Sequence, residues 1–331
     1  SIPMVEDILN RFLSKKMQSL KKKPFQVNQT LFLMIDKVAW YGNVVVSDIV
    51  KSGKNKRQSV LEVVVELYPW NDQNLPTTVN VQHLRILPAS VPVSRVFTAM
   101  TKISNPKFVL MLLGNEPIRQ IVFNNRIKYN RDLNDSQRVA IQSVLNNSIT
   151  VLQGPPGTGK TSTIYEIILQ LVEVLHTFPI SVVAASNIAI DNIAEKLMEN
   201  HEREILRIVS LEKESEYNLD HPLASICLHH KVFNDLPQNM KETLKDMRDP
   251  RKKVLQNQYK KLLQEQIRIS QKYVANAKVL FSTTVVPGGN QFKDIKKVPV
   301  IIMDEATQSS EATTLIPLSI EGVEKFVFVG D

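Results

Sequence analysis

A glycine-rich loop at residues 154–161 constrains the fold of this chain more than any other stretch of its sequence. The loop reads GPPGTGKT, a glycine and four further residues followed by Gly-Lys-Thr. An apolar, β-branched run, ITVLQ, precedes it, and the apolar helical pattern STIYEIILQLVEVLH follows it. A buried strand, a glycine loop and a helix in this order predict a phosphate-binding loop inside an α/β fold. A simple glycine turn between strand and helix is the competing interpretation.

Each residue type in the loop suits contact with phosphate. Gly157 and Gly159 allow tight turns that bring the backbone close to phosphate oxygens, and successive N–H groups form an anion-binding nest. We expect Lys160 to reach the β- and γ-phosphates as a point charge and the Thr161 hydroxyl to bind Mg²⁺. The residues expected to hold the nucleotide are Gly154, Pro155, Pro156, Gly157, Thr158, Gly159, Lys160, Thr161 and Ser162.

Composition and charge narrow the class of protein. The chain has 331 residues, enough for two or three domains, and its 43% hydrophobic and 22% charged content is that of an ordinary soluble globular protein. No apolar run is long enough to span a bilayer and no signal-peptide pattern opens the chain, so we expect no membrane partner. The single cysteine, Cys227, excludes an intrachain disulfide and a cysteine-based zinc site, which suits a reducing compartment. The net charge of +8 hints at a polyanionic partner.

The hydrophobic pattern divides the chain into segments. Residues 1–26 are expected to form a stalk helix, amphipathic over 2–23, and the short β-rich runs of residues 27–91 predict a small β-barrel. Residues 92–130 return to helix as connectors. The strands expected after them lie at 149–153, 181–185, 205–209, 278–283, 299–303 and 325–329. Strands alternating with helices predict a doubly wound parallel sheet.

A polar helical segment, residues 211–275, interrupts this alternation, so the sheet is expected to be built from residues 131–210 and 276–331. Between Lys241 and Lys278 there are eleven Lys or Arg residues against four acidic ones. This excess fits either a solvated helical face or contact with a polyanion. A coiled-coil-like seam is formed by Leu255, Tyr259, Leu262, Gln266, Ile269 and Tyr273.

An acidic pair, Asp304-Glu305, ends the apolar run VPVIIM. Downstream of a phosphate loop, such a pair completes a nucleotide-hydrolysing site. We expect Asp304 to hold Mg²⁺, directly or through water, and Glu305 to polarise the attacking water. The alternative is a helix start, where acidic residues are also favoured.

Polar residues at three further places are candidates for ligand contact. In LNDSQ, Gln137 is able to make two hydrogen bonds to an adenine edge, although Asn134 or Ser136 could simply cap the following helix. Ser186-Asn187 follows one expected strand, where open α/β sheets bind ligands, and capping is again the alternative. Thr283, Thr284 and the loop backbone from Val285 follow another strand and could contact a sugar-phosphate chain.

Together these motifs resemble those of superfamily 1B helicases of the up-frameshift and senataxin-like group, most of all the fungal helicases linked to translation termination. The resemblance covers about residues 130–331. The motifs that carry it are LNDSQ (133–137), GPPGTGKT (154–161), AASNIAID (184–191), STT (282–284), DEATQSSE (304–311) and VGD (329–331).

The resemblance implies a RecA-like fold and a nucleic-acid-stimulated ATPase that moves 5′→3′ along single-stranded RNA or DNA. ATP and Mg²⁺ are the implied cofactors; Gln137 would read adenine and Lys160, Asp304 and Glu305 would be catalytic. The implied nucleic-acid contacts are Ser186, Asn187, Thr283, Thr284 and Val285. Translation termination factors or the ribosome are the implied protein partners of a monomer in the cytoplasm or nucleus.

Gly330-Asp331 match the first two residues of the family motif Gly-Asp-x-x-Gln, and in the family a second motor domain follows this motif. We therefore expect this chain to be the first motor half of a longer helicase, poorly active alone without an arginine finger. A nucleotide-switched RNA- or protein-binding module without translocation is the second hypothesis. DEATQ and the motif at 184–191 disfavour a ring ATPase or a small-molecule kinase.

Overall fold

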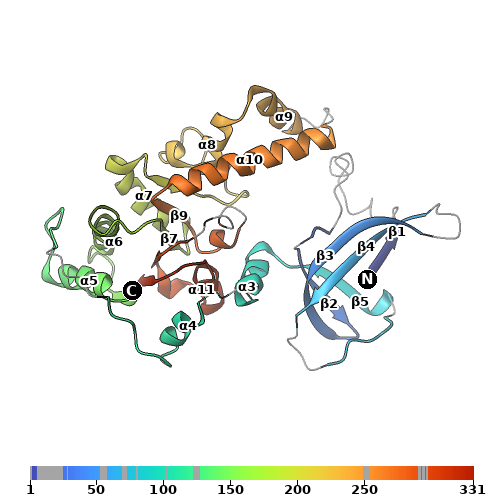
Figure 1. Ribbon diagram of the computed structural model, residues 1–331, viewed down its shortest axis with the longest axis horizontal. Helices are drawn as coiled ribbons and strands as arrows, with labels where there is room; N and C mark the ends of the chain where they lie inside the picture. The colour runs from blue at the N-terminus through green and yellow to red at the C-terminus, as the bar shows by residue number, and fades with distance from the viewer. Residues whose placement is uncertain are drawn as a thin grey trace. The chain divides into compact units, whose positions relative to one another are not determined.

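The computed structural model describes residues 2–5, 25–27, 29–52, 58–68, 73–79, 81–101, 103, 105–121, 127–248, 254–289, 292, 295 and 297–331 (Figure 1). The chain divides into two compact units. One comprises Ser1–Ser94 and Pro237–Leu263, and the other comprises Arg95–Leu236 and Gln264–Asp331.

Six parallel strands form the central sheet of the second unit, in the spatial order β6-β11-β10-β7-β9-β8. Their bounds are β6 (Ile149–Gln153), β7 (Ile180–Ala184), β8 (Ile205–Arg207), β9 (Val279–Thr283), β10 (Val300–Asp304) and β11 (Lys325–Gly330). All five pairings between them are parallel. The predicted doubly wound sheet is confirmed, and each strand lies within two residues of its predicted position.

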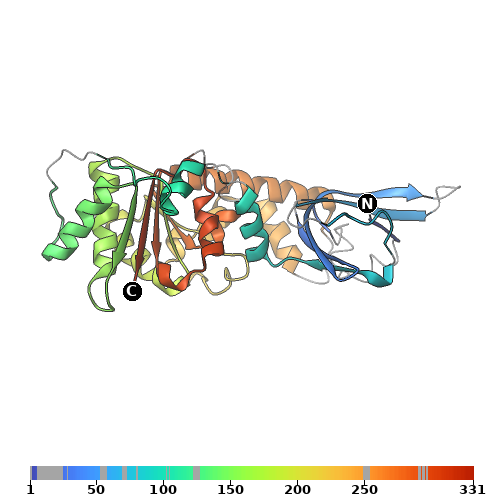
Figure 2. The ribbon, with the colours of Figure 1, turned by 90° about the horizontal axis from the view of Figure 1, so that it is seen from below.

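Helices cover both faces of this sheet, as the turned view in Figure 2 shows. The helices α5 (Asp135–Asn146), α6 (Lys160–Leu169) and α7 (Asn187–His201) share one core with alternate strand residues such as Val327. Side chains alternate along a strand, so Phe326 faces the opposite side. There it packs against Phe108 of α4 (Pro106–Leu112), with ring centroids 6.5 Å apart. Both faces are therefore buried, as an all-parallel sheet requires.

Five antiparallel strands form the sheet of the first unit, in the order β1-β4-β3-β2-β5. Their bounds are β1 (Ile2–Val5), β2 (Thr30–Ile35), β3 (Val38–Ser52), β4 (Gln58–Leu67) and β5 (Leu84–Pro88). One face is apolar and encloses a core of Leu31, Leu33, Ile35, Trp40, Val44, Leu61 and Val63. The β-rich character predicted for residues 27–91 is thus confirmed, and the pairings of the described strands run in an open series from β1 to β5.

Residues 2–5 form a strand and not the start of the predicted stalk helix. Strand β1 pairs with β4, Ile2 lying opposite Val63 and Val5 opposite Val60. The ladder satisfies backbone groups that a helix would otherwise pair locally, so tertiary pairing overrides the local helical pattern. Pro3, which has no N–H, is tolerated because β1 is an edge strand. Residues 6–24 of the predicted stalk lie outside the described residues.

The connectors (residues 92–130) and the polar segment (residues 211–275) are helical in part, since residues 113–121 and 211–223 contain no helix. Their α-helices are α3 (Val91–Thr101), α4, α8 (Leu228–Asp235), α9 (Gln238–Arg248) and α10 (Gln256–Asn276), and α11 (Glu311–Leu318) follows β10. Short 3₁₀ turns lie at Val81–His83, Ala224–Ile226, Val286–Gly288 and Ala306–Gln308, and a π-helical turn, Gln170–Val174, extends α6. In the predicted seam of α10, Leu262 and Ile269 are buried, whereas Leu255, just before the helix, is exposed. None of the described helices is both long and apolar enough to cross a membrane.

Candidate nucleotide and nucleic-acid site

Five of the predicted motifs converge because they lie at the carboxyl ends of parallel strands, which meet at one edge of the sheet. In spatial order these are the phosphate loop after β6, Gly330-Asp331 at the end of β11, Asp304-Glu305 at the end of β10, Ser186-Asn187 after β7 and Thr283-Thr284 at the end of β9. The strand order brings together residues from positions 154 to 331 of the chain. The topology thus assembles one site from motifs that are far apart in sequence.

The phosphate loop adopts the backbone conformation that its glycines predict. Gly157 and Gly159 have φ of 82° and 83°, in the left-handed region that favours glycine. The N–H of Gly154 donates to the Gly330 carbonyl at 3.1 Å, which ties the loop to β11. A Cβ placed on Gly157 would meet no atom within 4 Å, so the loop is open there. An open loop leading into the N-terminus of α6 fits a phosphate group.

Lys160, the first residue of α6, is held against this loop. Its Nζ donates to the carbonyls of Gly154 at 2.5 Å and Pro155 at 3.3 Å, and it also forms an ion pair with the Asp331 carboxylate. The ammonium therefore lies where the loop turns, with its charge compensated by a residue from the end of β11. An incoming phosphate would compete with Asp331 for this cation.

The acidic pair, Asp304-Glu305, lies at the end of β10. Asp304 is buried, and burial raises the pKa of its carboxyl, an effect that the nearby Lys160 opposes. The backbone N–H of Glu305 donates to Asp304 Oδ1 at 3.0 Å. Glu305 has φ of 51°, which is uncommon for a residue with a Cβ. Such strained backbone clusters at functional sites.

A cavity of about 250 Å³ joins these elements, and Lys160, Thr161, Asp304 and Glu305 all line it. The described residues contain no group of three or more His, Cys, Asp or Glu side chains that could hold a metal by themselves. Mg²⁺, however, is usually bound by one or two protein ligands together with substrate phosphates and water. A hydroxyl, Thr161, and a buried carboxylate, Asp304, therefore fit Mg²⁺ that arrives with a nucleotide.

Gln137 lies beside the phosphate loop, as its predicted role requires. Its Nε2 donates to the Thr158 carbonyl at 3.4 Å, and a Cβ on Gly159 would lie 2.6 Å from the same nitrogen. The capping alternative is also observed. Asn134 Oδ1 accepts from the Gln137 N–H at 2.8 Å, and Gln137 Oε1 accepts from the Asn134 N–H at 3.1 Å, a reciprocal capping box. Capping thus holds the amide of Gln137 beside the loop.

Ser186 and Asn187 begin α7, and each makes a contact that the sequence does not predict. The Ser186 hydroxyl caps the helix by accepting from the Ala189 N–H at 3.2 Å, and it donates to Glu305 Oε2 at 2.8 Å. Asn187 Oδ1 accepts from Nη2 of Arg207 at 2.8 Å. The capping alternative for Ser186 is therefore observed, together with a link to the acidic pair.

The residues after β9 depart in part from the prediction. Thr284 is buried because its N–H donates to the Ala184 carbonyl at 3.0 Å and continues the pairing with β7. Its hydroxyl has no hydrogen-bond partner among the described residues. Thr283 is half-buried, and the Val285 carbonyl accepts from Arg95 Nη1 at 2.8 Å. The Thr284 side chain is thus buried in this structure, and its contact with nucleic acid stays a prediction.

Sequence reasoning missed a buried polar cluster behind Asn187. The side chain of Arg207, on β8, has no exposed surface; its Nε donates to Asp191 Oδ1 at 2.8 Å and its Nη2 to Tyr217 Oη at 3.0 Å. Tyr217 Oη in turn donates to Asp191 Oδ2 at 2.6 Å. The available signal was the spacing of Asn187 and Asp191, which places both on one face of α7. Nothing local in the sequence marks Arg207 as their partner.

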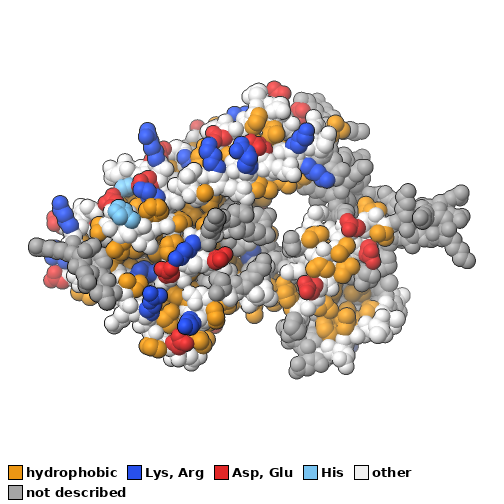
Figure 3. All heavy atoms as spheres, in the orientation of Figure 1, with side chains coloured by type: hydrophobic (Ala, Val, Ile, Leu, Met, Phe, Trp, Pro, Cys, Tyr) orange, Lys and Arg blue, Asp and Glu red, His pale blue; other side chains and the backbone are white. Residues whose placement is uncertain are grey.

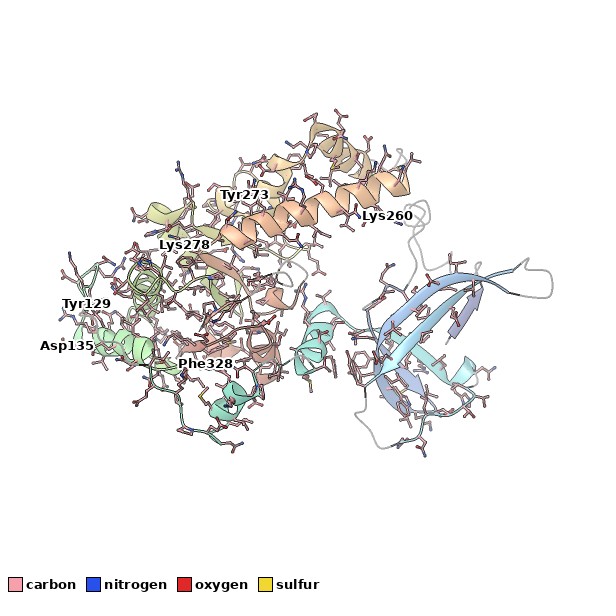
Figure 4. All side chains as sticks on the ribbon, viewed as in Figure 1. Tyr129, Asp135, Lys260, Tyr273, Lys278 and Phe328 are labelled. Atoms are coloured by element: carbon pink, nitrogen blue, oxygen red, sulfur yellow. The ribbon has the colours of Figure 1, made fainter. Side chains whose placement is uncertain are left out.

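Basic side chains lie on the exposed side of α10, and Figure 3 shows Lys and Arg along this helix. Lys260, Lys261, Arg268 and Lys272 are all exposed. Lys260 lies toward one end of the helix and Tyr273 toward the other (Figure 4). Arg268 pairs with Glu265 at 2.5 Å and Lys272 with Asp235 at 3.7 Å, so part of the positive charge is compensated locally.

Comparison with known proteins identifies the family and several relatives of this chain. Residues 132–258 and 229–331 match the family described as "AAA domain", and residues 1–90 match the "ECM32 domain". The chain is 46% identical over 328 residues to "Putative ATP-dependent RNA helicase ECM32" of Saccharomyces cerevisiae, covering 98% of this chain and 28% of that protein. It is 30% identical over 200 residues to "Regulator of nonsense transcripts 1 homolog" of Drosophila melanogaster, covering 60% of this chain and 16% of that protein. With "ATP-dependent helicase NAM7" of Saccharomyces cerevisiae it shares 32% identity over 199 residues, 60% of this chain and 20% of that protein.

Proposed function

Because the chain belongs to the AAA domain family, whose matched residues include the whole parallel sheet, we propose that it is the ATP-binding part of an ATP-dependent helicase. The proposed helicase moves 5′→3′ along single-stranded RNA or DNA, and nucleic acid stimulates its ATPase. The chain spans less than a third of the length of each relative described above, so this activity is proposed for the full-length protein.

One observation carries the proposal: the phosphate loop and the acidic pair line the same cavity. A phosphate-binding loop alone supports binding, whereas a carboxylate at the same cavity also supports hydrolysis. The cavity is further bounded by the first two turns of α7 through Ile188, Ala189 and Asn192. A nucleotide bound in this cavity would therefore contact the start of α7, which follows Ser186.

Each residue of the site has a proposed task. The loop backbone and Lys160 bind the phosphates, Gln137 reads the adenine edge, and Thr161 and Asp304 hold Mg²⁺. When bound, Mg²⁺ would neutralise charge that develops on the phosphates. Glu305 orients and polarises the attacking water. Ser186, Asn187, Thr283 and the backbone at Val285 lie along the proposed nucleic-acid track, which contacts sugar and phosphate and not base edges.

The test is the ATPase rate of the full-length protein with and without single-stranded RNA and DNA. We expect strong stimulation by single strands, and loss of activity in Lys160→Ala and Glu305→Gln. The same assay on residues 1–331 alone measures how much of that rate the described site supports by itself. An ATPase that single strands leave unchanged would refute the translocase.

A nucleotide-switched binding module remains the second candidate. The exposed basic side chains of α10 favour it as much as they favour a helicase. In that case Lys160→Ala would change the affinity for RNA or for a protein partner, and no nucleic-acid-dependent turnover would be found. Strand displacement on a substrate with a 5′ overhang, compared with a 3′ overhang, separates a motor from a switch and reports the direction.

A role in RNA metabolism or translation termination is proposed from the family resemblance. It implies termination factors or the ribosome as partners, and a monomer in the cytoplasm or nucleus. Sedimentation of the tagged protein with ribosomes, before and after RNase treatment, tests this role. Absence from every ribosomal fraction would count against it.

A further inference from the structure

Ser186 connects the first turn of α7 to the acidic pair. In the sheet, Ala184 of β7 is in register with Asp304 of β10, so the residues that follow these strands are neighbours. The Ser186 hydroxyl lies 2.8 Å from Glu305 Oε2 and also accepts from the Ala189 N–H at 3.2 Å. A carboxylate only accepts hydrogen bonds, so the hydroxyl donates its proton to Glu305.

A serine hydroxyl has a single hydrogen to donate. While Ser186 donates to Glu305, it has none for a phosphate oxygen at the α7 N-terminus. The same hydrogen bond occupies Oε2 of Glu305, so this oxygen is less available to accept a hydrogen bond from water. The two interactions of Ser186 therefore exclude each other.

We propose that Ser186 is a positioning residue that couples nucleic-acid binding to ATP hydrolysis through this exclusion. A phosphate of a single-stranded nucleic acid at the α7 N-terminus takes the Ser186 hydrogen bond, and the released Glu305 polarises the attacking water. The inference rests on the proposed function, which assigns Ser186 to the nucleic-acid track and Glu305 to water activation.

Thermodynamic linkage gives a test that needs no hydrolysis. If binding of the strand must break the Ser186–Glu305 bond, then removal of the acceptor must strengthen binding of the strand. Glu305→Ala removes the charge and the acceptor, whereas Glu305→Gln removes the charge but keeps an acceptor oxygen. Fluorescence anisotropy of a labelled single-stranded RNA, and of the matching DNA, is measured with the full-length protein without nucleotide.

We expect Glu305→Ala to bind the strand about fivefold more tightly than Glu305→Gln, which corresponds to about one hydrogen bond. In the Ser186→Ala background this difference should vanish, because no hydroxyl remains to be released. In the Ser186→Thr background, which keeps a hydroxyl, the difference should return. An equal difference in all three backgrounds would overturn the proposal.

The second readout is the ratio of stimulated to unstimulated ATPase rate. Ser186→Ala should raise the unstimulated rate and bring the ratio close to one. Ser310→Ala is the matched control, because Ser310 caps α11 by accepting from the Thr313 N–H at 3.2 Å and therefore loses a comparable helix cap. Its ratio should stay at that of the wild type.

Different results would refute the proposed function and the coupling through Ser186. If wild type shows no ATPase that depends on Lys160, the proposed function itself is wrong. If wild type is stimulated by single strands and Ser186→Ala is stimulated to the same degree, the proposed function stands and the coupling through Ser186 is wrong.

Discussion

The Nε of Arg207 donates to Asp191 Oδ1 at 2.8 Å inside a site where the arginine side chain has no exposed surface. Tyr217 bridges the pair, and burial with the hydrogen bond to Asp191 raises the pKa of its hydroxyl to about 12. The cluster joins β8, α7 and the segment after β8, so it fixes the first turn of α7. A buried ion pair of this kind is costly to break from one side, because the remaining charge stays buried without its partner.

Asp191→Ala should therefore lower the free energy of unfolding by about 3 kcal/mol. Urea titration followed by circular dichroism measures the change. The exposed pair Lys213–Glu216, at 2.6 Å, provides the control, and Glu216→Ala should cost less than about 1 kcal/mol. Equal costs for the two variants would show that burial adds nothing to the Arg207 pair.

Cys227 offers a probe of the same region, because it is buried and its thiol has a pKa raised to about 12, mainly by burial. The thiolate is the reactive form, so at pH 8 a disulfide reagent should react with the folded chain at least about a hundredfold more slowly than with the chain in urea. This cysteine is the only one in the chain, so the signal has a single source. A fast reaction under native conditions would contradict the observed burial.

The strands and the phosphate loop could be predicted from sequence because their signals are local. The run VPVIIMDE shows by itself that β10 is buried on both faces and ends in acids. The glycines of residues 154–161 likewise specify their own backbone. Strand order is not local, and it is the order β6-β11-β10-β7 that brings Asp331 to Lys160 and Ser186 to Glu305.

The features that the sequence does not reveal also have a physical pattern. Residues 2–5 carry helical spacing but pair with β4, and Thr284 carries a hydroxyl but is buried against β7. In both cases a partner distant in sequence decides the structure. Arg207 was missed for the same reason, because its partners belong to α7 and to the loop that contains Tyr217.

Because Lys325 is buried, we expect the free energy of unfolding to rise with pH. Its ammonium lies buried at the carboxyl end of α5 and donates to the carbonyls of Val144, Leu145 and Asn147, and burial lowers its pKa to about 8. Between pH 8 and about 10.5 the unfolded chain keeps this proton while the native chain has released it, so the free energy of unfolding increases with pH.

Lys325→Met removes the titration, so the stability of wild type relative to this variant should grow by about 2 kcal/mol from pH 7.5 to pH 10. Urea titrations at several pH values measure this difference and cancel other groups that titrate in both proteins. A difference that is constant over this range would contradict the lowered pKa of Lys325.

Gly159 should be required for nucleotide binding and not merely for the turn. Gly159 and Gly114 both have positive φ, 83° and 73°, so alanine at either position adds about 1 kcal/mol of backbone strain. A Cβ at Gly114 would meet nothing within 4 Å, whereas at Gly159 it would lie 2.6 Å from Gln137 Nε2. Both variants should lose similar stability, but only Gly159→Ala should weaken binding of a fluorescent ATP analogue, by about tenfold.

In the Gln137→Ala background the additional loss of nucleotide affinity from Gly159→Ala should shrink, because the side chain that the new methyl group displaces is gone. An undiminished loss there would mean that the methyl group acts directly on the phosphate loop.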